Sequence, residues 1–322
     1  MSLEKPAPAI LWFRKDLRLD DNPALHAAIE AGGPVIPVYI REPAHLNIGP
    51  LGAAQAWWLH HSLAALKASL NSLGGDLILA SGKAEDVLAD LARKTNATTV
   101  FVNRAYERTL FDRGIAIELK KREIAIRAFH GQLLHEPKSI RTGAGSAFKV
   151  FTPFWNALQK VGEPHEPMAA PTKIPSPEHF RPSENLEQWA LLPKKPDWAA
   201  DFGRMWIPGE AGAQEKLADV VDRQLHDYKR GRDLPSVDAT SLLSPHLAHG
   251  EVLPPASGMP SGACPQRLLR MLSISAANSP GGTSATICWP NSPNFTTGTG
   301  TTGSTASNGS TTPGSSAPGR RA

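Results

Sequence analysis

Short apolar runs alternate with helical patterns through the first part of the chain. The runs are rich in β-branched side chains, and between them apolar residues recur at the spacing of a helix. Alternation of this kind is typical of a parallel sheet whose strands are joined by crossover helices. We therefore expect an α/β fold with a doubly wound, five-stranded parallel sheet. The expected strands are residues 9–13, 34–40, 76–80, 98–102 and 124–129.

Capping residues and glycines mark the helices between these strands. Asp21 or Asn22 can cap a helix that carries Pro23 in its first turn. A longer pattern, which includes two tryptophans, closes at Gly74 and Gly75. Another helix fits the string KAEDVLADLARK, whose valine and leucines form one apolar stripe. Three helices are thus expected before the fourth strand.

The pattern changes where prolines crowd together, over residues 162–208. Proline lacks a backbone N–H and fixes φ, so we expect neither a helix nor a central strand in this stretch. An ordered linker that crosses the surface, and with it a domain boundary, is expected instead. Residues 210–229 again show apolar side chains at helical spacing, which indicates the start of a second, helical unit.

Composition and charge change abruptly after Val252. The whole chain, with 41% hydrophobic and 20% charged residues, has the balance of a soluble globular protein. All acidic residues, lysines and histidines precede Leu253, and the arginines beyond it account for the net charge of +4. The body is therefore neutral, and its charge does not indicate a nucleic-acid partner. Both cysteines also lie beyond Leu253, so neither a disulfide nor a thiol-ligated metal is expected in the body.

Targeting signals are not apparent in the chain. A membrane span needs about 20 predominantly apolar residues, and no window of the sequence offers them. We expect a cytoplasmic protein that does not associate with a membrane.

The loop after the first strand, WFRKDLRLDD, carries the first candidate chemistry. In a doubly wound sheet the ligand crevice lies outside the carboxyl ends of the strands, which places Arg14, Asp16 and Arg18 near it. Either these side chains face a ligand, or Asp16 pairs with one of the arginines to fix the loop. Neither GxGxxG nor GxxxxGK[ST] follows this strand, which disfavours a nucleotide hydrolase.

Four longer strings carry a family resemblance: LWFRKDLRLDDNPAL, VFVNRAYE, KVFTPFWNAL and WIPGEAGAQEKL. Together the chain resembles the DNA photolyase and cryptochrome family over nearly all of residues 9–252. The resemblance implies an α/β domain that holds an antenna chromophore, methenyltetrahydrofolate or a deazaflavin. It also implies a helical domain that holds FAD, which repairs pyrimidine dimers in damaged DNA by light-driven electron transfer.

The most specific local match is the string YKRGRDLPSVDATSLLSPHLAHGE, which resembles the family's first FAD-binding segment. The resemblance implies that Tyr228 contacts the flavin and that Arg232 contacts DNA. It assigns the flavin phosphates to residues 240–244, here named the TSLLS segment, whose hydroxyls and backbone N–H groups suit an anion. Taken alone, the same residues fit a helix cap. The members of the segment are Thr240, Ser241, Leu242, Leu243 and Ser244.

Two positions depart from the family pattern, and a third has two interpretations. Leu242 stands where Arg, His or Lys is expected, and His249 stands where an aromatic residue is usual. Flavin contacts at both of these positions are therefore open. Asn103 matches a position that contacts the pterin in some family members, and a buried Asn that ends a strand is the alternative.

The family pattern stops after HLAHGEV. The family implies an aromatic-rich helical core there, but the chain continues as LPPASGMPSGACPQRLL and later as GTGTTGSTASNGSTT. Read in one other frame, the codons of residues 278–309 permit a string that contains WRDF and NWN and looks like the missing core. We therefore expect a frameshift near Val252, and a tail that is disordered because it has few large apolar residues. The expected parts are the antenna domain 7–135, the linker 136–208, the truncated start of the FAD domain 209–252 and the tail 253–322.

The expected function is that of the deoxyribodipyrimidine photolyase lineage, a light-dependent carbon–carbon lyase that works as a monomer on DNA with pyrimidine dimers. Most of the FAD domain is missing, and the helix from Glu210 is expected to lack partners for its apolar face. We therefore expect this chain to hold no flavin and to be inactive. The alternatives are a cryptochrome-like blue-light photoreceptor and an isolated antenna or nucleotide-binding module over residues 9–158.

Overall fold

The computed structural model of the chain describes residues 6–43, 51–106, 109–133, 135, 139–161, 167–177, 183–220, 222, 234, 236–237 and 240–253. Within these residues, no helix combines the length and the apolar character that crossing a membrane requires. The tail after Leu253, for which we predict disorder, lies outside the described residues.

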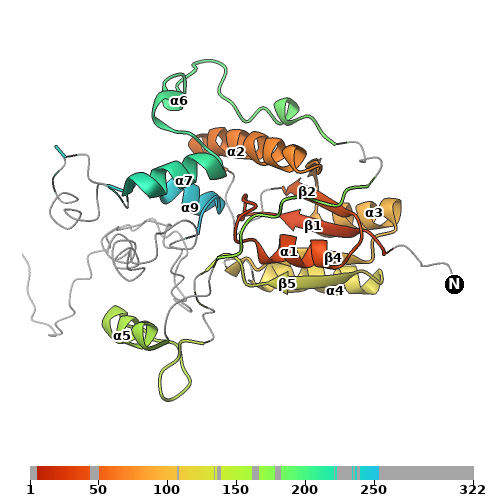
Figure 1. Cartoon of the computed structure of the whole chain (residues 1–322), viewed down its shortest axis with the longest axis horizontal. Coiled ribbons are helices and arrows are strands. Elements are labelled where there is room, and N and C mark those ends of the chain that lie inside the picture. Colours follow the sequence, from red (N-terminus) through yellow and green to blue (C-terminus); the bar gives the residue numbers. More distant parts are fainter. Residues whose placement is uncertain are drawn as a thin grey trace, which may run out of the picture. The chain divides into compact units, whose positions relative to one another are not determined.

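Five parallel strands form one sheet in the order β3-β2-β1-β4-β5 (Figure 1). Each strand agrees with the expected one to within two residues at either end. Ile10 of β1 lies in register between Ile36 and Val100 on the neighbouring strands. The order of the strands reverses between β1 and β4, so their carboxyl ends form the topological switch point. The strands are β1 Ala9–Phe13, β2 Val35–Arg41, β3 Ile78–Ser81, β4 Thr99–Asn103 and β5 Ala125–Phe129.

Helices cover both faces of the sheet, which confirms the doubly wound α/β class. Side chains alternate between the two faces along a strand, so β1 contributes to two cores. Leu11 and Phe13 pack with α1 and α2 on one face, and Ile10 and Trp12 pack with α3 and α4 on the other. All five residues of β1 are buried, as is typical of a central strand in a parallel sheet. The helices are α1 Pro23–Glu30, α2 Ala53–Ser72, α3 Ala84–Thr95 and α4 Thr109–Lys121.

Local signals explain where two of these helices begin or end. The side chain of Asn22 caps α1 by accepting the backbone N–H of Leu25 at 3.1 Å. After α2, Gly74 adopts a φ of 85°, in the left-handed region that glycine favours. The sequence pattern did not predict α4, because Gly114 interrupts it and Ile117 is 57% exposed.

The described part of the proline-rich stretch packs on the α/β domain, and it contains short helices. The prediction that it holds no helix is wrong for two single turns, η2 and α6, which fit between the prolines. The stretch also does more than cross the surface, since Ile174 and Trp189 belong to the same core as α2. The backbone N–H of Ile174 donates to the carbonyl of Leu73 at 3.0 Å. The helices within the expected linker are α5 Phe151–Val161, η2 Leu186–Trp189 and α6 Phe202–Met205.

Two helices of the second unit, α7 (Glu210–Asp219) and α9 (Ser244–His249), both contact α2. Ala213, Leu217 and Val220 are at most 4% exposed. The expectation that this helix lacks partners for its apolar face is therefore wrong for its described part. The rest of the expected helix, toward residue 229, lies almost entirely outside the described residues.

Candidate functional site

Asp16 in the loop between β1 and α1 fixes that loop at the switch point. It is 1% exposed, and its Oδ1 accepts the backbone N–H of Arg14 at 2.6 Å while its Oδ2 accepts Nδ2 of Asn103 at 2.7 Å. The side chain of Arg14 instead pairs with Asp112 on α4, at 2.7 Å. The interpretation that Asp16 fixes the loop is supported, but the hydrogen bonds described for its carboxylate come from amide groups and not from an arginine side chain.

Asn103 ends β4 and joins three segments of the chain. Its Nδ2 donates to Asp16 and, at 2.8 Å, to Oδ1 of Asn22, and its Oδ1 accepts the backbone N–H of Ala24 at 3.3 Å. Gly131 packs so closely that a Cβ there would lie 2.4 Å from Oδ1 of Asn103. These contacts describe the buried Asn of our second interpretation. Contact with an antenna chromophore stays a prediction.

Arg18 is a buried cation that also joins three segments. It is 2% exposed, and its guanidinium donates to the carbonyl oxygens of Gly250 at 3.0 Å, Asp21 at 2.7 Å and Gly131 at 2.7 Å. Burial lowers the pKa of Arg18, and the nearby negative charges, that of Asp16 foremost, oppose this shift. Because Gly250 follows α9, Arg18 ties the second unit to the sheet.

Glu210, the first residue of α7, provides a second tie. Its two carboxylate oxygens accept the backbone N–H groups of Leu19 and Asp20, each at 2.8 Å. Burial raises the pKa of Glu210, and these two hydrogen bonds act against the shift. The start of α7 is thereby held on the β1–α1 loop.

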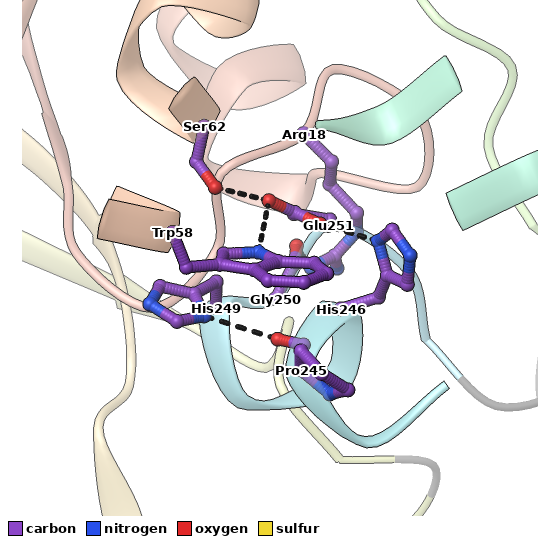
Figure 2. A network of polar contacts seen from close by, with 8 residues as sticks. All are labelled: Arg18, Trp58, Ser62, Pro245, His246, His249, Gly250 and Glu251. Atoms are coloured by element: carbon purple, nitrogen blue, oxygen red, sulfur yellow. Dashed lines mark hydrogen bonds and ion pairs between the residues drawn. The ribbon is translucent and has the colours of Figure 1, made fainter. Parts of the chain in front are cut away.

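Glu251 provides a third tie, and its side chain is entirely buried. Its Oε1 accepts the indole N–H of Trp58 at 3.0 Å and the hydroxyl of Ser62, and its Oε2 lies 2.5 Å from Nδ1 of His246 (Figure 2). Trp58 and Ser62 are four residues apart on α2 and so share one helix face. One carboxylate therefore connects α2 to α9.

His249, at the end of α9, occupies the position where an aromatic residue is usual. Its ring lies against that of Trp58, with centroids 6.1 Å apart and an interplanar angle of 23°. Its Nδ1 donates to the carbonyl of Pro245 at 3.0 Å, and its own carbonyl accepts the N–H of Leu17 at 3.1 Å. Burial lowers the pKa of His249. The imidazole thus packs as an aromatic ring would, against the α/β domain.

The TSLLS segment leads directly into α9, and two of its hydroxyls are accessible. Thr240 and Ser244 are exposed, Ser241 is half-buried and Leu243 is 2% exposed. The N-cap residue of α9 is Leu243, and no side chain caps this helix. The helix-cap interpretation of these residues is therefore wrong. Leu242 has a φ of 51°, a left-handed conformation that is uncommon for a bulky residue.

The other predicted site residues, Tyr228 and Arg232, lie outside the described residues, so their contacts stay predictions. Sequence reasoning missed the polar side chains that hold the two units together, Glu210 and Glu251 above all. The available signal was the position of Glu251 in the string HGEVL, where a carboxylate stands among small and apolar residues.

The sequence that forms the doubly wound sheet matches a known family. A family model described as DNA photolyase matches residues 9–176. The chain belongs to the DNA photolyase family. It is 55% identical over 258 residues to a deoxyribodipyrimidine photo-lyase of Agrobacterium fabrum, and the alignment covers 80% of this chain and 53% of that protein.

Two further similarities are to a protein more distant in sequence and to a solved structure. The chain is 34% identical over 257 residues to Cryptochrome-1 of Arabidopsis thaliana, covering 76% of this chain and 36% of that protein. It is also similar to the crystal structure of a bacterial class III photolyase from Agrobacterium tumefaciens, with a TM-score of 0.78 and 49% identity, covering 86% of this chain and 60% of that one. The chain thus spans about half the length of the curated photo-lyase that it matches.

Proposed function

We propose that the chain is the N-terminal half of a deoxyribodipyrimidine photolyase, whose intact form uses light and FAD to split cyclobutane pyrimidine dimers in DNA. The supporting observation is the 55% identity to a photo-lyase over 258 residues. An aligned stretch of that length in a chain of 322 residues must include residues 240–244, and so it contains the TSLLS segment. The identity to the cryptochrome is lower, at 34%, which favours repair over light sensing.

The TSLLS segment suits the phosphates of FAD. Its exposed hydroxyls, on Thr240 and Ser244, can donate to phosphate oxygens because neither caps α9. The left-handed Leu242 is the kind of residue from which anion-binding backbone turns are built. We assign Tyr228 to the flavin and Arg232 to DNA. When bound, FAD supplies the electron that opens a dimer flipped out of the duplex.

We further propose that the chain alone does not repair DNA. A flavin is held by many contacts at once, and the chain spans only about half of the photo-lyase that it matches. A frameshift near Val252 explains the loss of acidic residues, lysines and histidines after this point. Sequencing the gene tests it: a shifted frame that encodes WRDF and NWN supports the frameshift, and a gene without either string refutes it.

The decisive experiment on function uses a repair-deficient bacterial strain. The gene with its frame restored should give survival after ultraviolet irradiation that depends on blue light, and the gene as it stands should not. A restored protein that binds FAD without light-dependent repair would point to a photoreceptor instead. If the chain as it stands purifies yellow and keeps flavin through gel filtration, the loss of flavin binding from which we infer its inactivity is wrong.

The antenna chromophore of the α/β domain is a separate proposal. We propose methenyltetrahydrofolate or a deazaflavin, bound by the α/β domain, with Asn103 as a contact. Because the amide of Asn103 already bonds Asp16, Asn22 and Ala24, such a contact requires rearrangement of that network. Absorbance of the purified chain after addition of methenyltetrahydrofolate, compared with an Asn103→Ala variant, tests the proposal. Size-exclusion chromatography of the same sample tests the expected monomer.

A further inference from the structure

The position of the TSLLS segment depends on α9. The segment ends at Ser244, which is also the first residue of the helix, and the carbonyl of Leu243 accepts the N–H of Leu247 at 2.9 Å. Among the described residues, the side-chain hydrogen bond within the segment is long: Oγ of Ser241 and the N–H of Leu243 are 3.5 Å apart. Whatever fixes α9 therefore also fixes the end of the segment that joins it, Leu243 and Ser244.

A buried carboxylate fixes α9 on the α/β domain. Glu251 is fully buried, and its two oxygens face different elements (Figure 2). Oε1 accepts from Trp58 and Ser62 on α2, and Oε2 is bonded to His246 on α9. The backbone N–H of Glu251 also donates to the carbonyl of His246 at 3.0 Å.

Because Glu251 is buried, its carboxylate depends on the hydrogen-bond donors around it. A carboxylate removed from water is costly unless donors surround it, and hydrogen bonds to a charged group are stronger than those between neutral groups. A glutamine at residue 251 would keep one acceptor oxygen for α2 but would turn an NH₂ group toward His246, whose Nδ1 would then have to accept. The hydrogen bonds to α2 and α9 would in any case lose the negative charge that strengthens them.

We propose that Glu251 is a positioning residue for the TSLLS segment. Through His246 it holds α9, and with α9 the segment, on the face of α2 that presents Trp58 and Ser62. The inference rests on the proposed function, in which this segment receives the flavin phosphates. The α/β domain then does more than carry an antenna chromophore, because it sets the place of one edge of the flavin site.

Glu184 offers a matched control within the same chain. Its carboxylate also accepts an indole N–H, that of Trp189 at 2.6 Å, and a serine hydroxyl, that of Ser81 at 2.7 Å. It joins η2 to the end of β3, and the hydrogen bonds described for it do not reach α9. Glu184→Gln therefore removes the same chemistry from a different and more exposed place.

Hydrogen exchange of the full chain, measured by mass spectrometry, tests the proposal. In Glu251→Gln the amides of Leu243, Leu247, Gly250 and Glu251 should exchange about tenfold faster or more, while those of the sheet strands stay unchanged. In Glu184→Gln the same four amides should keep their wild-type rates. If all four amides keep their wild-type rates in Glu251→Gln, Glu251 does not position the segment. The same conclusion follows if the amide of Leu243 keeps its rate while the other three exchange faster.

A second pair of variants serves if Glu251→Gln fails to fold. Trp58→Phe keeps an aromatic ring at residue 58 and the carboxylate of Glu251, but it removes the indole N–H that donates to that carboxylate. The same amides should therefore exchange faster than in the wild-type chain, by a smaller factor than in Glu251→Gln. Trp189→Phe, its control, should leave them unchanged, and equal rates in both variants would overturn the proposal. No flavin is present in these measurements, so they decide the position of the segment even if the repair experiment fails.

Discussion

Gly250 approaches Lys15 so closely that a Cβ on Gly250 would lie 2.0 Å from the carbonyl oxygen of Lys15. Gly250 also has a φ of 67°, in the left-handed region. It ends α9, and its own carbonyl accepts from Arg18. The end of α9 can therefore approach the β1–α1 loop this closely only because Gly250 has no side chain.

Gly250→Ala should consequently destabilise the chain. The new methyl group overlaps backbone atoms that cannot move aside, and alanine disfavours a positive φ, so we expect a loss of about 3 kcal/mol or more. Urea denaturation followed by circular dichroism measures it. Gly114→Ala is the control, because a Cβ at Gly114 meets nothing within 4 Å and alanine should stabilise α4 by about 0.5–1 kcal/mol. Equal stabilities of the two variants would contradict the close approach.

Asn103→Ala should be costly for a different reason. It leaves acceptor oxygens of Asp16 and Asn22 and the N–H of Ala24 without this partner, in a region where all four residues are buried. Oδ1 of Asn22 keeps the N–H of Leu25, which leaves two unsatisfied groups. Each costs about 1–3 kcal/mol, so we expect a loss of about 2–6 kcal/mol in a thermal or urea melt.

The control for Asn103 is the exposed Asn185, which caps the single turn η2 by accepting the N–H of Glu187 at 3.0 Å. Asn185→Ala should cost about 1 kcal/mol or less. A loss at Asn103 no larger than the loss at Asn185 would mean that the buried network does not stabilise the switch point.

Arg18→Lys tests whether the fork of the guanidinium is needed. Arg18 reaches three carbonyl oxygens from two nitrogens, and an ammonium group has neither the planarity nor the spread to replace it. We expect a loss of about 2–4 kcal/mol on urea denaturation. Arg204→Lys, in an exposed pair with Asp201, should change stability by less than about 0.5 kcal/mol. A tolerated lysine at residue 18 would show that charge alone suffices there.

The sheet could be predicted from the sequence because its signals are local. Each strand is a short apolar run between polar turns, and Asn22 with Pro23 announces the start of α1. α4 escaped prediction because Gly114 and the exposed Ile117 blur its apolar stripe. A helix or strand could be predicted where the spacing of its apolar residues is regular, and α4 could not because single residues interrupt that spacing.

The candidate site could be predicted only in part, since its ties join residues far apart in the chain. Trp58 and Glu251 are separated by 193 positions, and no spacing in the sequence indicates that an indole N–H and a carboxylate meet. The family resemblance located the TSLLS segment, but it gave no partner for Glu210 or for Glu251. The missing part of the FAD domain likewise suggested a helix from Glu210 without partners, whereas buried side chains hold its described part on α2 and Glu210 itself bonds the β1–α1 loop.

The remaining prediction concerns pH and follows from the burial of His249. Burial lowers the pKa of His249 below its ordinary value of 6.5, although the hydrogen bond to Pro245 and the charge of Glu251 oppose the shift. Lys15 and His246, which also face the ring, lower it further. A histidine whose pKa is lower in the folded state binds fewer protons when folded. Its contribution to stability is therefore complete above pH 6.5 and is lost as the pH falls through the folded pKa.

His249→Phe should remove this part of the pH dependence while keeping an aromatic ring against Trp58. The decrease in melting temperature from about pH 7.5 to about pH 5.5 should be larger in the wild-type chain than in the variant. His249→Gln, which cannot titrate either, separates the loss of charge from the loss of the imidazole hydrogen bond to Pro245. It should share the shallower pH dependence even if its stability at neutral pH is lower. The same fall in melting temperature in all three proteins would show that His249 does not couple folding to pH.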